Sequence, residues 1–238
     1  AKDEVAKALG IPDEKVRVIT PFVGGGFGGK NANGQAVEAA RLSKLTGKPV
    51  QVAWTRQDEF FNDTYRPAAV VKIDSGIDDK GIICFWEYHV YWAGERGAQH
   101  FYSIPHSLTA AHGAGWGGSV GTHPFATGAW RAPGNNTNTF ARESQIDVMA
   151  AAAKMDPVEF RLKNMTEPKM RRVLETAAAK FGWKPAPAPS GRGFGVACGI
   201  DAGTLVATMV EVHVDKTTGK VTVKRVVAAQ DMGLAINP

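Results

Sequence analysis

Five glycines around one phenylalanine form the feature that most constrains this chain: Gly24-Gly25-Gly26-Phe27-Gly28-Gly29-Lys30. The run follows an apolar stretch at residues 16–23 and precedes a stretch at 33–46 with a helical pattern. Glycine adopts positive φ values and lets a ligand approach main-chain N–H groups closely. A loop of this kind in front of a helix is a suitable place to bind an anionic group.

Three general interpretations of this loop compete. A phosphate-binding P-loop has the pattern G-x-x-x-x-G-K-[ST], which the loop fits through Lys30, but Asn31 stands where Ser or Thr binds magnesium. A dinucleotide fold has the pattern G-x-G-x-x-G, which the glycines also fit, but Glu59 comes about ten residues too late to be its acidic residue. The third interpretation is a glycine-rich turn without a ligand.

Several stretches favour helices. They are residues 3–9, residues 33–46 with Asn33 as N-cap, residues 138–155, a helix begun by Asp156-Pro157, and a helix from Pro168 to Gly182. The apolar side of the stretch at 138–155 is expected to include Phe140, Ile146 and Met149. The last helix has a core stripe made of Met170, Val173, Leu174, Ala177, Ala178 and Phe181.

Other stretches favour strands. Apolar runs at 16–23 and 49–54 predict strands on either side of the glycine-rich run and its helix, and the polar residues 56–67 predict a loop. Residues 69–76 and 82–92 predict a hairpin, with one face of its second strand made of Trp86, Tyr88, Val90 and Trp92. Residues 209–215 and 220–229 predict a second hairpin. Helices and strands are segregated in runs, so the expected fold class is α+β.

Residues 93–129 are expected to be the least regular part of the chain. They are rich in glycine and contain four of the six histidines, namely His100, His106, His112 and His123. The spacings of these histidines match no familiar zinc pattern, and no cysteine lies nearby. We expect this stretch to line a substrate funnel or to contact further chain.

A stretch rich in Pro, Ala, Ser and Gly at 185–193 is the best candidate for a linker. We therefore expect a first subdomain at residues 1–184, a linker at 185–193 and the start of a second, truncated subdomain at 194–238. The chain begins within a helical pattern and ends within a strand or loop, which suggests an internal fragment of a longer polypeptide.

Charge and cysteine content argue against several classes of protein. The net charge of +5 comes from scattered basic residues, so no nucleic acid is expected as a partner. No apolar run approaches the about 20 residues of a membrane span. Cys84 and Cys198 lie far apart in apolar surroundings, which predicts buried free thiols, and the chain has no iron–sulfur cysteine set.

Four blocks together resemble one known family. They are residues 16–30 with the glycine-rich run, Thr127-Gly128-Ala129-Trp130-Arg131-Ala132-Pro133-Gly134, residues 156–162, and Asp231-Met232-Gly233 with Ile236-Asn237-Pro238. Their order and spacing are similar to the molybdopterin-binding large subunit of the molybdenum hydroxylases, the xanthine dehydrogenase/aldehyde oxidase family. The sequence around Arg131 most resembles that of the isoquinoline oxidoreductase/nicotinate dehydrogenase branch.

This resemblance implies which residues contact the molybdopterin, for which the cytosine dinucleotide is one of the compatible forms. Gly25, Gly26, Phe27 and Gly28 should lie against the cofactor and Arg131 should reach it, while no residue here ligates the metal directly. Asn31 and Pro133 should face the substrate. Xanthine-specific members carry a glutamate at the position of Asn31, so xanthine is not the expected substrate. Other members carry an aromatic residue that stacks on the substrate at the position of Pro133, so this position does not identify the substrate.

The resemblance also implies an activity and partners. The parent protein would be an oxidoreductase that hydroxylates N-heteroaromatics or oxidises aldehydes with water-derived oxygen. Its iron–sulfur clusters would lie on a partner small subunit, and the remaining large-subunit segments would complete the site. The general base, a glutamate, is expected beyond Pro238, so no catalytic residue is assigned here and the fragment alone should be inactive. The alternative is a non-catalytic glycine-rich binding or assembly module of the same fold. Bacterial cytoplasm and periplasm are both compatible with this family.

Overall fold

A computed structural model describes residues 1–30, 32–113, 115, 123–184 and 191–237. The chain forms two compact units: unit 1 comprises Ala1–Ala68 and Trp116–Pro133, and unit 2 comprises Ala69–Gly115 and Gly134–Pro238. Most of the expected linker at 185–193 lies outside the described residues, so a division of the chain at that point stays a prediction.

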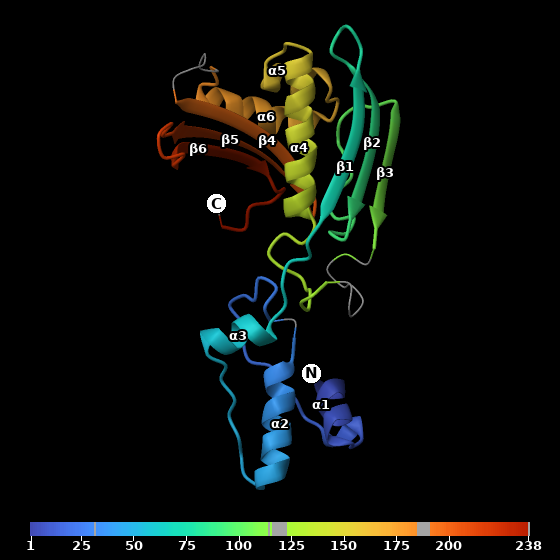
Figure 1. The fold of residues 1–238 in the computed structure, drawn as a ribbon, viewed down its shortest axis with the longest axis vertical. Coiled ribbons are helices and arrows are strands. Elements are labelled where there is room, and N and C mark those ends of the chain that lie inside the picture. The colour runs from blue at the N-terminus through green and yellow to red at the C-terminus, as the bar shows by residue number, and fades with distance from the viewer. Residues whose placement is uncertain (31, 114, 116–122, 185–190, 238) are drawn as a thin grey trace. The chain divides into compact units, whose positions relative to one another are not determined.

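Unit 1 contains helices and connecting segments. Its elements are α1 (Lys2–Leu9), the short 3-10 helix η1 (Asp13–Lys15), α2 (Gly34–Thr46) and α3 (Arg56–Asn62). α1 packs against α2, and both end at a left-handed glycine, Gly10 or Gly47 (Figure 1). Asn33 occupies the N-cap position of α2 as expected, but its side chain donates to Glu4 Oε1 at 2.9 Å instead of capping the helix.

Three expectations for unit 1 were wrong. Residues 16–23 and 49–54 form no strand, because a strand needs a hydrogen-bonded neighbour and the described residues provide none there. Ile19 and Phe22 are accordingly exposed. Residues 56–67 are not simply a loop, because Thr55 and Asp58 form a capping box that begins α3.

Unit 2 contains two three-stranded sheets. The first has the order β1 (Val70–Ile77), β2 (Ile83–Tyr91), β3 (His106–His112), and the second has the order β4 (Arg192–Asp201), β5 (Thr204–Val214), β6 (Val221–Asp231). β1 pairs antiparallel with β2, and β5 with β6, so both expected hairpins are confirmed. β3 lies within the stretch expected to be irregular and pairs parallel with β2.

Three helices accompany these sheets: α4 (Asn135–Ala152), α5 (Pro157–Lys163) and α6 (Pro168–Phe181). α4 contacts both β1 and β4 and lies between the two sheets, while α6 covers β5 and β6 (Figure 1). Segregated helices with one mixed and one antiparallel sheet confirm the α+β class.

The core of unit 2 follows the predicted apolar faces with two exceptions. Trp86, Tyr88 and Val90 are fully buried, and the predicted stripe of α6 is buried from Met170 to Phe181, with Ala178 only partly covered. Trp92 instead is 37% exposed, because its backbone has a φ of 71° and leaves the strand. Phe140 is 76% exposed and not part of the apolar side of α4, which is formed by residues such as Ile146 and Met149.

Both cysteines are free, as expected, with Cys198 buried and Cys84 half-buried. Among the helices of the described residues, none is long and apolar enough to cross a membrane.

The cap of α5 provides a test of how unit 2 is held together. Asp156 Oδ1 accepts the main-chain N–H groups of Val158 at 2.8 Å and Glu159 at 3.1 Å, and its Oδ2 accepts the indole N–H of Trp183 at 2.9 Å. Asp156→Ala should lower the free energy of unfolding by about 0.5–2 kcal/mol, measured by urea denaturation. Asp156→Asn, which still caps, should lose clearly less, and equal losses in the two variants would show that capping is not what stabilises α5.

Candidate functional site

The glycine loop, defined as residues 24–30, has an unusual backbone. Gly25 and Gly28 have φ values of 148° and 116°, and Phe27 has a φ of 52°, a left-handed value that is uncommon outside glycine. The Gly29 N–H donates to Gly26 O at 2.9 Å and closes a turn within the loop. The Phe27 ring lies against Gly25, where an added Cβ would be 3.1 Å from the ring.

The loop packs directly on a second predicted block. A Cβ on Gly28 would lie 1.8 Å from Ala129 O and 2.8 Å from Trp130 Cα, so only glycine permits this approach. Residues 126–133, which we call the arginine segment, therefore lie against the glycine loop although about a hundred residues separate them in sequence. Unit 1 thus joins the two blocks that carry the predicted cofactor-binding residues.

A third segment, after α3, anchors the arginine segment. The Tyr65 N–H donates to Ala126 O at 2.8 Å, and the Gly128 N–H donates to Tyr65 O at 3.0 Å, which gives a parallel bridge between Tyr65 and Thr127. A Cβ on Gly128 would lie 2.3 Å from the hydroxyl oxygen of Thr64. The arginine segment is consequently held on one side by main-chain bonds and on the other by the glycine loop.

A pocket of about 690 Å³ opens beside these segments within unit 1. Glycine-loop residues 25–27, 29 and 30 line it. Aromatic rings contribute much of the remaining wall, namely Phe60, Tyr65 and Trp130. Its charged side chains are Lys30, Arg56, Arg66, Glu59 and Asp63.

The charges in this pocket are only partly compensated. Arg56 forms an ion pair with Glu59, and Asp63 Oδ1 accepts the Thr64 N–H at 2.7 Å. Lys30 has no hydrogen bond or ion pair with the described residues. A pocket with main-chain glycines and spare positive charge suits an anionic ligand.

The other predicted site residues lie at different places. Arg131 is exposed, and its guanidinium makes no hydrogen bond or ion pair within the described part of the chain, so it is free to meet a ligand. Pro133 is half-buried near the end of the arginine segment, and Asn31 lies outside the described residues. The fourth block lies in unit 2, where Asp231, Met232 and Gly233 line a separate pocket of about 520 Å³.

Sequence reasoning missed the residues after α3. Thr64 and Tyr65 fix the arginine segment, yet nothing local distinguishes them, because their partners lie about 60 residues away. Thr55 and Asp58 form a capping pair that can be recognised in the sequence, but it marks only the start of α3, the helix before Thr64 and Tyr65.

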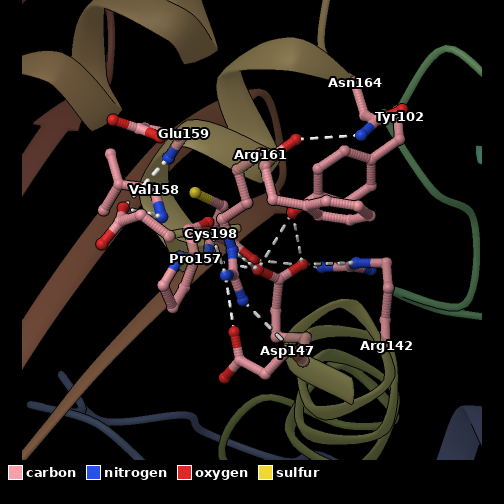
Figure 2. Close-up of polar contacts among 12 residues, drawn as sticks. Tyr102, Arg142, Asp147, Pro157, Val158, Glu159, Arg161, Asn164 and Cys198 are labelled. Atoms are coloured by element: carbon pink, nitrogen blue, oxygen red, sulfur yellow. Dashed lines mark hydrogen bonds and ion pairs between the residues drawn. The ribbon is translucent and has the colours of Figure 1, made fainter. Parts of the chain in front are cut away.

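A second polar cluster lies buried in unit 2 (Figure 2). Glu143, on α4, accepts hydrogen bonds from Tyr102 Oη at 3.1 Å, Arg142 Nε at 3.2 Å, Arg161 Nε at 3.1 Å and the Cys198 N–H at 2.9 Å. Figure 2 shows the side chains of Tyr102, Arg142 and Arg161 pointing into the same polar cluster. Arg161 also bonds Asp147 at 2.6 Å, which balances the charges as two arginines and two acids.

This cluster has the character of a structural core. Burial by itself lowers the pKa of Arg161, but the interactions with Glu143, Tyr102 and Asp147 together outweigh it and the pKa is raised. Burial, reinforced by Glu143, raises the pKa values of Tyr102 and Cys198, so both keep their protons near neutral pH. Glu143, 3% exposed and surrounded by donors, has no access to a substrate. Among the described residues, no group of three or more His, Cys, Asp or Glu side chains could hold a metal ion.

Comparison with known proteins assigns the chain to a family. A profile described as a molybdopterin cofactor-binding domain matches residues 1–165, and a second with the same description matches residues 147–238. The chain belongs to the molybdopterin cofactor-binding domain family. Within this family, the first profile covers the glycine loop and the arginine segment, and the second covers β4, β5, β6 and Asp231.

Curated relatives of this molybdopterin cofactor-binding chain confirm the resemblance to molybdenum hydroxylases. The aldehyde oxidoreductase molybdenum-binding subunit PaoC of Escherichia coli K12 is 34% identical over 248 residues, covering 94% of this chain and 34% of the relative. Isoquinoline 1-oxidoreductase subunit beta of Brevundimonas diminuta is 28% identical, covering 98% of this chain and 32% of the relative. The chain spans about a third of the length of these relatives.

A solved structure supports the fold. Quinoline 2-oxidoreductase from Pseudomonas putida 86 superposes with a TM-score of 0.65 at 21% identity, covering 93% of this chain and 34% of that one. The P-loop and dinucleotide interpretations of the glycine loop are thereby replaced by the molybdopterin cofactor-binding family.

Proposed function

We propose that unit 1 forms part of the molybdopterin site of an oxidoreductase. The observation that carries this proposal is the contact of Gly28 with Ala129 and Trp130, which joins the glycine loop to the segment that presents Arg131. The family to which the chain belongs is defined by binding this cofactor, so the joined segments are the natural candidates for the contact surface.

The residues of unit 1 fit such a group. The cofactor is anionic, and main-chain N–H groups at Gly26, Phe27 and Gly28 together with the guanidinium of Arg131 are suited to bind negative charge. The positive φ values at Gly25, Phe27 and Gly28 turn consecutive peptide groups away from regular secondary structure, which leaves them available to a ligand. Lys30 adds a further positive charge to the pocket wall.

When bound, the molybdenum–pterin group supplies a two-electron oxidation in which a water-derived oxygen is added to an electron-poor carbon of the substrate. Phe27, with 71% of its surface exposed, is placed to cover the ligand and exclude water. Arg131 holds its permanent charge toward the anionic group. Glu59 is paired with Arg56, and Asp63 accepts the Thr64 N–H, so we propose neither as the general base. The resemblance to the molybdenum hydroxylases implies that this role belongs to a glutamate beyond Pro238.

The names of the relatives and the residues of the pocket wall support a proposal for the substrate class. Relatives are named for aldehyde, isoquinoline and nicotinate oxidation, and the rings of Phe60, Tyr65 and Trp130 suit a flat aromatic molecule. We therefore propose an aldehyde or N-heteroaromatic substrate, with Asn31 and Pro133 on its side of the site. Because these relatives are named as subunits, we propose an iron–sulfur partner subunit and further large-subunit segments as partners.

Arg131 provides the first test of this function. The protein is expressed from its complete coding sequence in a host that makes the molybdenum cofactor, and molybdenum and acid-released pterin are measured per protein. Arg131→Met should weaken cofactor binding about 10- to 150-fold, because it removes a charge-assisted bond worth about 1.5–3 kcal/mol.

Arg41→Met is the matched control, because Arg41 is an exposed arginine of α2 that is not part of the proposed site. The Arg41→Met variant should retain the wild-type content of molybdenum and pterin. A wild-type protein without molybdenum and pterin would contradict the proposed function, and equal contents in the Arg131 and Arg41 variants would remove Arg131 from the site.

A further inference from the structure

Arg66 bonds two consecutive carbonyl groups of the arginine segment. Its Nη2 donates to Arg131 O at 2.6 Å, and its Nη1 donates to Ala132 O at 3.3 Å. Arg66 directly follows Tyr65, whose main chain pairs with residues 126–128. The planar fork of a guanidinium can span two neighbouring acceptors in this way, which a single ammonium group cannot.

The backbone that Arg66 holds is strained. Ala132 has a φ of 56°, a left-handed value that disfavours any residue with a Cβ by a factor of about 5–30. Pro133 follows it, and a residue before proline is biased toward extended conformations. Without an external restraint, the peptide between Arg131 and Pro133 would therefore leave this conformation readily.

We propose that Arg66 is a positioning residue: its guanidinium fixes the strained turn at Ala132 and thereby holds Arg131 toward the anionic ligand. This inference rests on the proposed function of unit 1. It assigns Arg66 a role through the main chain of its neighbours and none through direct contact with the ligand. The position of the Arg131 guanidinium thus depends on a backbone segment that Arg66 restrains.

The alternative is that Arg66, which also lines the pocket, acts through its charge alone. Three substitutions separate the two roles. Arg66→Met removes both bonds and the charge, Arg66→Lys keeps the charge but cannot bridge both carbonyls, and Ala132→Gly removes the strain because glycine adopts a φ near 56° freely.

The expected results concern the pterin content of the purified protein. Arg66→Met should weaken cofactor binding about tenfold, and Arg66→Lys should be impaired nearly as much. Adding Ala132→Gly to Arg66→Met should recover at least about fivefold of this tenfold loss, up to the wild-type level, because the turn no longer needs a restraint. Ala132→Gly alone should bind as the wild type does.

A second measurement does not depend on the cofactor. Hydrogen exchange of the Tyr65 and Gly128 amides, which bond Tyr65 to the arginine segment, should be faster in the cofactor-free Arg66→Met protein than in the wild type, with Arg41→Met as the unchanged control. Full binding by Arg66→Lys, or no rescue by Ala132→Gly, would overturn the positioning role. Absence of pterin from the wild type would instead contradict the proposed function, so the two failures are distinguishable.

Discussion

Gly28→Ala should abolish cofactor binding while unit 2 stays folded. The new methyl group would meet Ala129 O at 1.8 Å and Ala129 C at 2.6 Å, and both are main-chain atoms that cannot rotate away. Residue 28 also has a φ of 116°, which disfavours alanine whatever the space around it. The glycine loop and the arginine segment must therefore separate.

The expected size of this effect is large. Overpacking of this kind costs about 3 kcal/mol, which corresponds to a loss of more than about a hundredfold in affinity for a ligand that needs both segments. Molybdenum and pterin content per protein measure it, and circular dichroism checks that the sheets of unit 2 persist.

Gly24→Ala is the matched control in the same loop. Gly24 has no atom within 4 Å of an added Cβ and no positive φ, so this variant should keep the wild-type cofactor content. If Gly28→Ala retained the cofactor as well as Gly24→Ala does, the contact between the two segments would not be part of the site.

Glu143→Ala should strongly destabilise unit 2. It would leave Arg142 and Arg161, which are 1% and 0% exposed, facing each other's charge without the carboxylate that both contact. It would also leave the Tyr102 hydroxyl and the Cys198 N–H without their acceptor. Removing one partner of a buried ion network costs about 3–5 kcal/mol.

The comparison with Glu143→Gln separates charge from hydrogen bonding. Glutamine keeps an acceptor oxygen but not the negative charge, so it should recover only a small part of the lost stability. Glu175→Gln is the control, since Glu175 and Arg171 form an exposed i,i+4 pair worth about 0.5 kcal/mol or less. Urea denaturation measures all three variants, and a loss below about 1 kcal/mol in Glu143→Ala would contradict a structural role for this cluster.

The parts of the fold that depend on local signals were predictable from the sequence. The Asp156-Pro157 cap, the buried stripe of α6 and both hairpins are determined by residues close together in the chain. The strands expected at 16–23 and 49–54 were wrong because an apolar run does not reveal whether a neighbouring strand exists to pair with it. β3 was not predicted because it lies in a glycine-rich stretch without a clear strand pattern. Its pairing partner, β2, lies earlier in the chain, and local sequence does not reveal that pairing.

The site was predictable in its parts but not in its assembly. The glycine loop and the block around Arg131 are visible in the sequence, and the need for glycine at 28 follows only from the carbonyl of Ala129 that lies against it. Tyr65 and Arg66 carry no local signal, because their role is to bond main-chain groups of a segment about 60 residues away. Phe140 shows the same limit on a helix, where an apolar residue at a plausible position is exposed.

The most direct test of the proposed site is the position of molybdenum in crystals of the cofactor-loaded protein, found from anomalous diffraction at the molybdenum edge. If the glycine loop and the arginine segment form the site, the anomalous peak lies beside Phe27, with the Gly26–Gly28 main chain and Arg131 contacting the bound group. A molybdenum peak without contact to the glycine loop or Arg131 would contradict it.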